Sequence, residues 1–309
     1  MTNRPCLLTA VCAVFFLAAP AASAQDRGSV NPRPLPPLAN PDDPKLPAKE
    51  LFGRKATAAP LAARAVGFYT RGCVAGAKAL PINGLTWQVM RLSRNRNWGH
   101  PDLIAFLERL ASKAPKAGWA GILVGDLAQP RGGPMLTGHG SHQVGLDADI
   151  WLTPMPKREL SLQEREEMSA VKVVAEDKRD IDPNVWTPAH VNIIRAAAQD
   201  PEVERVLVNA AIKKAVCRDA KGDRSWLQKV RPWWGHDYHM HIRVGCPKDS
   251  PDCKSQDPTP QGEGCGKELD YWFQESILNP PPPKEPPKPK PPITMADLPP
   301  ACRQILLAP

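Results

Sequence analysis

The sequence alternates polar and apolar side chains over one short stretch, Asp147-Ala148-Asp149-Ile150-Trp151-Leu152. Successive side chains of a strand point to opposite faces, so this pattern predicts a strand with both aspartates on one face and apolar residues in the core. A second stretch, His239-Met240-His241-Ile242-Arg243-Val244, has the same period and predicts a second strand. Its polar face carries both histidines and the arginine. Two such strands can meet at one site, and they form the expected frame of the fold.

Histidines are concentrated near these two strands. Five of the seven histidines in 309 residues lie at positions 139–142 and 236–241, where a uniform distribution would place about 0.2. Imidazole nitrogens and carboxylate oxygens are ligands that Zn²⁺ takes, and a catalytic zinc needs three of them with one position left for water. His142, Asp149 and His241 can supply that set. A single buried histidine is more often a core residue than a ligand, so the prediction depends on the joint pattern.

The residues around the first histidine pair predict a loop. Gly138, Gly140 and Gly145 would each weaken a helix by about 1 kcal/mol, so His142 is expected on a glycine-rich loop that leads into the strand. His190 lies outside both clusters, near an expected helix start, and a solvated role is expected for it.

Helices and further strands are expected around this frame. Leu103, Phe106, Leu107 and Leu110 have the spacing of an amphipathic helix. Thr187-Pro188 predicts a helix start, with the helix continuing to about residue 198. Short apolar runs at 122–124 and 206–208 are typical of strands. The pattern therefore predicts an α+β fold, in which a small antiparallel sheet carries the metal site and helices pack around it.

The two ends of the chain differ in composition from the middle. Residues 1–24 have Arg4, an apolar run and Ala22-Ser23-Ala24, which predicts a signal peptide cleaved after Ala24 and export to the periplasm. The apolar run is too short for a good membrane span, so no integral membrane segment is expected after processing. Residues 25–60 and 279–300 are rich in proline, and we expect them to be extended. The expected catalytic domain is therefore 61–278, with a linker at 279–300 and a C-terminal segment at 301–309.

Cysteine usage fits an exported protein. Of eight cysteines, six remain after removal of the signal peptide, and an even number in an oxidising compartment predicts disulfides. Six cysteines allow 15 pairings, and the spacing alone does not choose among them. A thiolate zinc site is disfavoured because no Cys-x-x-Cys pair is present.

Several runs resemble a known family. The spacing His142-x6-Asp149, followed by His239-x-His241, resembles the lysostaphin/D-Ala-D-Ala-peptidase/hedgehog group of zinc proteins. The resemblance to penicillin-insensitive murein endopeptidases is more specific, and it extends from about Gly67 to Trp272 and resumes near 299–302. The runs that carry it are Arg71-Gly72-Cys73-Val74-Ala75-Gly76-Ala77, Gly99-His100-Pro101-Asp102-Leu103, Gly138-His139-Gly140-Ser141-His142-Gln143, Gly145-Leu146-Asp147, Asp149-Ile150 and Lys229-Val230-Arg231-Pro232-Trp233.

The resemblance implies roles for individual residues. It places the active-site zinc at His142, Asp149 and His241, and non-ligand catalytic histidines at His239 and His236. It further implies a second metal site near a subunit contact, and therefore a possible homodimer, through His139, Asp177 and Asp180. The family has a histidine where this chain has Asp180, and an aspartate can still bind zinc. The disulfides that it implies are Cys73–Cys302, Cys217–Cys265 and Cys246–Cys253.

The resemblance implies that the substrate is the D-alanyl–meso-diaminopimelyl cross-link of peptidoglycan, and the expected activity is its hydrolysis by a zinc-activated water. No His-Glu-x-x-His motif is present, so His239 is the expected general base and His236 the expected oxyanion stabiliser or proton donor, with the reverse assignment open. The net charge of +8, or +7 without Arg4, suits a polymer that carries carboxylates. Export and the absence of a nucleic-acid motif disfavour a nucleic-acid partner. The alternatives are a zinc D,D-carboxypeptidase and a non-catalytic zinc-containing wall-binding module.

Overall fold

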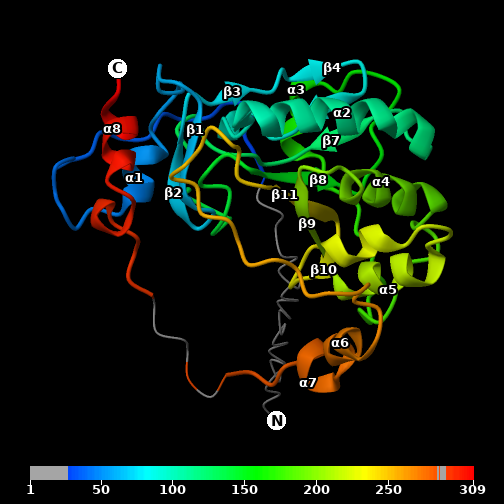
Figure 1. Ribbon diagram of the computed structural model, residues 1–309. Coiled ribbons are helices and arrows are strands. Elements are labelled where there is room, and N and C mark those ends of the chain that lie inside the picture. Colours follow the sequence, from blue (N-terminus) through cyan, green and yellow to red (C-terminus); the bar gives the residue numbers. More distant parts are fainter. Residues whose placement is uncertain (1–26, 284, 286–289) are drawn as a thin grey trace, which may run out of the picture.

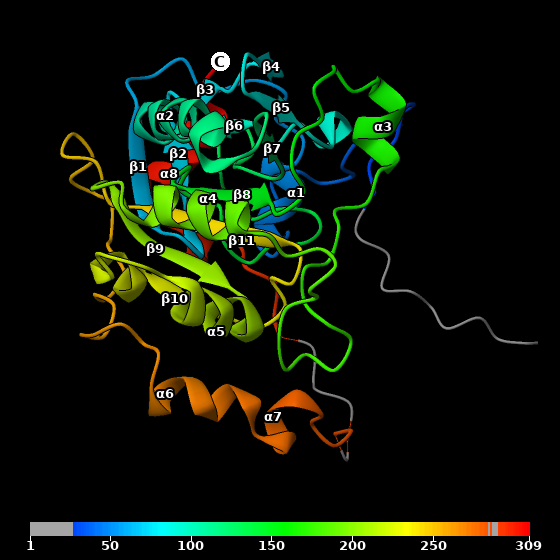
Figure 2. The ribbon, with the colours of Figure 1, turned by 90° about the vertical axis from the view of Figure 1, so that its right-hand side faces the viewer.

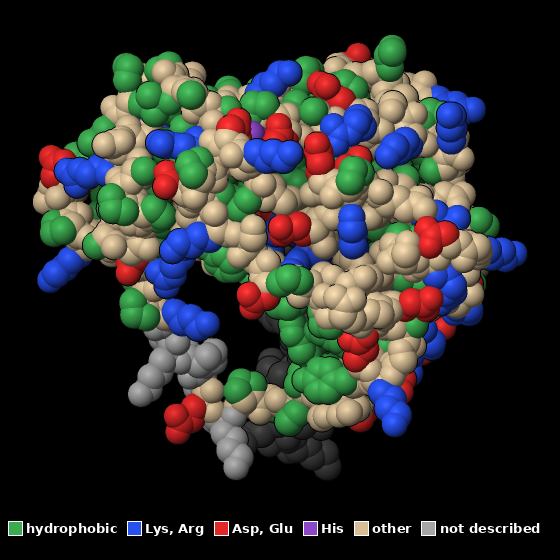
Figure 3. All heavy atoms as spheres, in the orientation of Figure 1, with side chains coloured by type: hydrophobic (Ala, Val, Ile, Leu, Met, Phe, Trp, Pro, Cys, Tyr) green, Lys and Arg blue, Asp and Glu red, His purple; other side chains and the backbone are tan. Residues whose placement is uncertain are grey.

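The structure is a computed structural model that describes residues 27–283, 285 and 290–309 (Figure 1). The expected signal peptide, 1–24, lies outside the described residues. Among the residues that are described, no helix is long and apolar enough to cross a membrane. Figure 3 shows basic and acidic side chains interspersed over the visible face, so the charge on that face is not gathered into a patch of one sign.

A seven-stranded mixed sheet forms the centre of the molecule. Its order is β10 (Val230–Pro232), β9 (Val203–Val208), β11 (His239–Val244), β8 (Asp147–Trp151), β7 (Ile122–Val124), β5 (Trp87–Val89) and β4 (Asn83–Gly84). Along the series β9, β11, β8 and β7, each strand is antiparallel to the next, as expected. The sheet is larger than expected because parallel pairs, β10 with β9 and β5 with β7, extend it at both sides. The α+β class is confirmed.

Two smaller antiparallel pairs complete the strands. A hairpin joins β1 (Arg64–Phe68) to β2 (Arg71–Ala75), and β3 (Lys78–Ala79) pairs with β6 (Trp98–Gly99).

Three helices cover one face of the sheet: α2 (Pro101–Ala117), α4 (Pro188–Ala198) and α5 (Ala210–Asp219). Figure 2 looks onto this face and shows them in front of the strands. The helix expected from Leu103, Phe106, Leu107 and Leu110 is confirmed, and these four side chains are buried. Pro101 begins α2, and Gly118 ends it in the left-handed conformation at φ 105°. The apolar sides of β8 and β11 pack in the same core, so their polar sides face away from these helices.

The remaining helices are short. They are α1 (Ala48–Phe52), α3 (Leu162–Glu167), α6 (Lys267–Asp270), α7 (Glu275–Leu278) and α8 (Ala301–Leu307), together with 3₁₀ turns at Leu92–Arg94, Ser225–Lys229, Tyr271–Phe273 and Met295–Asp297. The expectation that 25–60 is extended throughout is wrong at α1. Ala48 and Phe52 are buried against Cys302, Ile305 and Leu306, because proline-free residues 48–52 can form a turn of helix and bury an apolar face.

His190 also differs from expectation. It is 2% exposed and completes the N-terminal cap of α4. Its Nδ1 accepts a hydrogen bond from the backbone N–H of Thr187 at 3.0 Å, and its Nε2 lies 3.0 Å from the carbonyl oxygen of Leu152. The ring stacks on Trp186 with centroids 5.0 Å apart. The solvated role is therefore wrong, because both ring nitrogens find backbone partners in the core.

The three expected disulfides are present: Cys73–Cys302, Cys217–Cys265 and Cys246–Cys253. The first joins β2 to α8 and so attaches the C-terminal segment to the body, across a sequence separation of 229 residues.

Candidate metal centre

The polar faces of β8 and β11 meet as the two sequence patterns predict. Asp149 pairs in register with His241, and Asp147 with Arg243. The Nδ1 of His241 lies 3.0 Å from Oδ1 of Asp149, and its Nε2 lies 3.1 Å from Oδ1 of Asp147. Adjacent strands thus bring together groups that are about ninety residues apart in the chain.

His142 reaches the same point from the glycine-rich loop. Its backbone is left-handed, with φ 65°, and its N–H donates to Oδ2 of Asp147 at 3.0 Å. The imidazole is fully buried, with its centroid 4.7 Å from that of His241 and its Nε2 3.5 Å from Oδ2 of Asp149. Among the described residues, neither ring nitrogen has a hydrogen-bond partner.

These atoms fit a metal ion. A buried polar atom without a partner costs about 1–3 kcal/mol, and a cation bound by one of the nitrogens of His142 would remove that cost for it. Two imidazoles and a carboxylate form the nitrogen and oxygen donor set that suits zinc. The structure therefore brings together the predicted set of His142, Asp149 and His241.

His139 lies at the same centre. Its Nε2 is 3.1 Å from Oδ2 of Asp126, and its Nδ1 is 3.5 Å from Oδ2 of Asp149. Its ring centroid is 4.6 Å from that of His142. One ligand atom from each of His139, His142 and Asp149 lies within 4.8 Å of the other two, so among the described residues these three form a group that could hold an ion, with His139 in the place predicted for His241.

The proposed partners of His139 at a second metal lie elsewhere. Asp180 forms ion pairs of 3.1 Å with Lys214 and with Arg218, and Asp177 accepts the backbone N–H of Arg179. Within the described part of a single chain, these two aspartates do not join His139 in a group close enough to share an ion. A second site of this composition would therefore need ligands from two chains or a rearranged loop.

The two predicted catalytic histidines flank the centre. His239 lies on the same face of β11 as His241, is 8% exposed, and has its Nε2 3.7 Å from Oδ1 of Asp149. His236 lies on the preceding loop with φ 55°, and its ring centroid is 4.7 Å from that of His239. Its Nδ1 is 2.6 Å from the carbonyl oxygen of Trp234. A carbonyl can only accept, so Nδ1 carries the proton and the neutral ring presents Nε2 as an acceptor.

Burial and neighbouring charges shift the pKa values in opposite directions. Burial tends to raise the pKa of Asp149, but His142, His239 and His139 outweigh it and hold that pKa well below its usual range. Burial tends to lower the pKa of His241, but Asp147 and Asp149 raise it to about 9. Burial lowers the pKa of His239 to about 3, so this ring is neutral at neutral pH.

Two buried carboxylates organise the centre and were not assigned a role from the sequence. Asp147 holds the N–H of His142, the Nε2 of His241 and, at 2.6 Å, the Nε of Arg243. The polar–apolar alternation that indicated Asp149 as a ligand also places Asp147 on the same face of the strand. The sequence could therefore have predicted that Asp147 lies at the centre.

Asp126 follows β7 and forms ion pairs with Arg94 at 3.0 Å and with Arg96 at 2.9 Å, besides its contact with His139. Its position two residues after the buried strand β7 is a signal that could have indicated it. A cavity of about 340 Å³ opens onto this group and is lined by Asp126, His139, Asp149, Tyr238 and His239. The centre is thus accessible to a ligand.

Known proteins resemble this chain over most of its length. The sequence model of the family described as penicillin-insensitive murein endopeptidase matches residues 65–307. A protein of that name from Yersinia enterocolitica is 47% identical over 233 residues, which are 75% of this chain and 84% of the relative. One from Haemophilus influenzae is 46% identical over 79% of this chain and 82% of its own length. One from Klebsiella pneumoniae is 42% identical over 79% of this chain and 86% of its own length. The chain therefore belongs to the penicillin-insensitive murein endopeptidase family of peptidases.

Proposed function

We propose that this chain is a zinc-dependent endopeptidase that hydrolyses D-alanyl–meso-diaminopimelyl cross-links of peptidoglycan in the periplasm. The observation that carries the proposal is the convergence of His142, Asp149 and His241 on one point, where the buried imidazole of His142 has no hydrogen-bond partner among the described residues. Membership of a murein endopeptidase family supports the substrate.

The proposed zinc ligands are His142, Asp149 and His241. A zinc ion held by these residues would supply Lewis-acid chemistry, for polarising a scissile carbonyl and for activating water at neutral pH. His139 is the alternative third ligand beside His142 and Asp149, since it lies within the same group. His241 is preferred because it lies in a central strand, where the register with β8 fixes its position.

Proton transfer is proposed for His239 and His236. His239 is the proposed general base because it lies on the same face of β11 as His241, with its Nε2 3.7 Å from Oδ1 of Asp149. His236 would then stabilise the developing oxyanion or donate to the leaving amine. The hydrogen bond from His236 to the Trp234 carbonyl leaves Nε2 as an acceptor, which supports the reverse assignment as the second candidate.

The proposed location and partners follow from the same observations. Three disulfides suit an oxidising compartment, and peptidoglycan lies outside the cytoplasmic membrane. Export would depend on the signal peptide proposed at 1–24. The proposed homodimer, with a second metal held by His139, Asp177 and Asp180, would be detected by sedimentation and by a metal content above one ion per chain.

Digestion of purified sacculi tests the proposal. The protein is incubated with sacculi, with and without a metal chelator, and the muropeptides are separated after release from the glycan. We expect cross-linked dimers to be converted to monomers, and chelation to prevent this. Loss of terminal D-alanine from pentapeptides, with dimers unchanged, would instead indicate a carboxypeptidase. Binding to sacculi without any change in muropeptides would indicate a wall-binding module.

A further inference from the structure

A groove with three tryptophans on its walls lies beside the metal centre. Its volume is about 600 Å³, and its lining includes Trp233, Trp234 and Trp272. Trp233 and Trp234 are 51% and 53% exposed, and the rings of Trp234 and Trp272 lie 4.9 Å apart at an angle of 58°. Tryptophan offers a wide apolar ring face together with one N–H donor, so exposed tryptophans in a groove suit a ligand that has both apolar faces and polar edges.

The groove is joined to the metal centre by the loop that precedes β11. Gly235 and Asp237 line the groove, and between them His236 turns its ring toward His239 and His241, at centroid distances of 4.7 Å and 6.0 Å. A molecule in the groove would therefore lie next to the loop that carries His236, a proposed catalytic histidine. The groove does not include the proposed zinc ligands, so it is a separate subsite.

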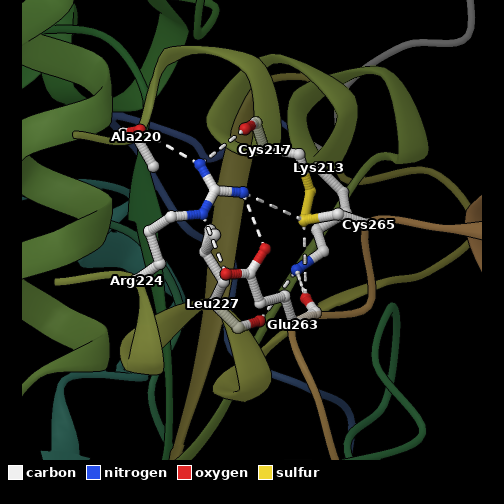
Figure 4. The surroundings of a disulfide bond; sticks show 7 residues. All are labelled: Lys213, Cys217, Ala220, Arg224, Leu227, Glu263 and Cys265. Carbon is white, nitrogen blue, oxygen red and sulfur yellow. Dashed lines mark hydrogen bonds and ion pairs between the residues drawn. A yellow bond between two sulfur atoms is a disulfide. The ribbon is translucent and has the colours of Figure 1, made fainter. Parts of the chain in front are cut away.

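The far wall of the groove is a segment fixed by a disulfide. Cys265, which precedes α6, is bonded to Cys217 of α5. Around this bond, Arg224 pairs with the carboxylate of Glu263 at 2.7 Å, and Lys213 donates to the carbonyl oxygens of Leu227 and Glu263 (Figure 4). These contacts hold the chain that continues to Trp272.

The opposite wall comes from the segment between α3 and α4. Figure 2 shows this segment descending beside α5 toward α7. Arg179 forms an ion pair of 2.6 Å with Glu275, and Lys178 donates to the carbonyl oxygen of Leu278 at 3.4 Å. Both walls are thus tied to each other as well as to α5, and the groove has a defined shape.

The charges of the groove favour a neutral ligand. Its lining holds two lysines and two acidic residues, Lys172, Lys178, Glu176 and Asp237, so these charges cancel. Lys172 is paired with Asp237 at 3.3 Å, and Lys178 donates to a carbonyl. An acidic peptide would need unpaired cations in the groove. The N-acetylated sugars of a glycan that carries peptide stems are uncharged, and their rings have apolar C–H faces and polar rims.

We propose that the groove binds the glycan strand of peptidoglycan, with sugar rings packed on Trp234 and Trp272 while the attached peptide reaches the metal centre. This proposal rests on the proposed function, because the glycan is presented through the peptide that is cleaved. An extended stem of a few residues spans about 3.5 Å per residue, so it can connect two adjacent subsites. The groove would thus select cross-links that remain attached to glycan.

Two substrates that differ only in sugar test this proposal. A cross-linked muropeptide dimer carrying disaccharides is compared with the same peptide dimer after an amidase has removed them. We expect the wild-type protein to have a KM at least tenfold lower for the sugar-carrying dimer. Trp272→Ala, which is remote from the catalytic loop in sequence, should lower kcat/KM for that dimer at least tenfold more than for the sugar-free dimer. Trp234→Ala should do the same, and Leu85→Ala, at a 98% exposed apolar position outside the groove, should not.

Binding of chitotetraose, followed by tryptophan fluorescence, is measured separately from turnover. We expect saturable binding that is lost in Trp272→Ala and kept in Leu85→Ala. Equal turnover of the two dimers, with no chitotetraose binding, would overturn the proposal and leave the endopeptidase function standing. Failure to cleave either dimer, with chitotetraose still bound at Trp272, would contradict the function and support the groove. A Trp272→Ala protein that changes only its sedimentation would show that the groove is a contact between copies, which also overturns the proposal.

Discussion

At the scale of single residues, His142 shows how local conformation creates the centre. A non-glycine residue with φ 65° is in a sparsely populated region that costs on the order of 1–3 kcal/mol. The Asp147 carboxylate holds this backbone through the His142 N–H, and the same carboxylate contacts His241. One buried aspartate thus orients histidines from both the loop and β11, as outer carboxylates do around metal ligands.

We predict that His142→Ala, Asp149→Ala and His241→Ala each lose the tightly bound metal, because three protein ligands are the minimum for a catalytic zinc. His139→Ala serves as the matched control, since it removes an imidazole from the same cluster and leaves the proposed set intact. Metal content per chain after dialysis, measured by atomic spectroscopy, checks this. If His241→Ala kept its ion and His139→Ala lost it, the ligand set would instead be His139, His142 and Asp149.

A second residue-scale prediction concerns His239. His239→Ala should keep its metal and lose kcat by on the order of 10²–10⁴, the usual contribution of a general base. His236→Ala, measured on the same substrate, shows which ring sets the pH dependence of kcat/KM. Turnover of His239→Ala close to that of the wild type would remove this residue from the mechanism.

At the scale of elements, the periodicity of the sequence predicted the two central strands, but it did not predict the strands and caps that surround them. The alternation at 147–152 and 239–244 placed β8 and β11 and the face that carries the ligands. The parallel pairs near the sheet edges and the buried cap formed by His190 depend on contacts between distant parts of the chain. A short window of sequence does not contain both partners of such contacts, so it cannot predict them. Asp126 was missed for the same reason, because its arginine partners Arg94 and Arg96 lie 32 and 30 residues earlier in the chain.

Helix α5 carries a prediction about pH. Lys213 is fully buried, and burial lowers its pKa from 10.5 to about 7. Between these values the unfolded chain binds more protons than the folded chain, so this group makes stability rise with pH, by up to about 1.4 kcal/mol per pH unit. Below about pH 7 Lys213 is protonated in both the folded and the unfolded chain, so burial of its charge destabilises the folded chain by its full amount.

Lys213→Met is the variant that checks this, because methionine keeps the length of the side chain and cannot titrate. Urea unfolding of both proteins between pH 6 and 9 gives the difference in slope, while other titrating groups contribute equally to both. We expect the free energy of unfolding of the wild type, relative to that of Lys213→Met, to increase as the pH rises above 7. Parallel curves would show that Lys213 has an ordinary pKa.

At the scale of the whole molecule, the C-terminal segment closes the fold. Helix α8 packs with α1 in one apolar cluster, and the guanidinium of Arg131 donates to the carbonyl oxygens of Ile305, Leu306, Ala308 and Pro309. The segments expected at 25–60 and 301–309 therefore meet in a shared core (Figure 1). From composition, residues 25–60 were described only as proline-rich and residues 301–309 only as a terminal segment. The Cys73–Cys302 disulfide implied by the family was the one prediction that attached the C-terminal segment to the catalytic domain.

Because it attaches the C-terminal segment to β2, the Cys73–Cys302 disulfide is expected to stabilise the fold more than the short-range Cys246–Cys253 disulfide. Cys73–Cys302 spans 229 residues and Cys246–Cys253 spans 7. Loss of the cross-link releases loop-closure entropy in the unfolded chain, which amounts to about 5 kcal/mol for the long loop and about 2.5 kcal/mol for the short one. We therefore expect Cys73→Ser/Cys302→Ser to lower the free energy of unfolding in urea by roughly twice as much as Cys246→Ser/Cys253→Ser. Equal losses in the two double variants would show that local contacts, and not closure of the chain, determine what each disulfide contributes.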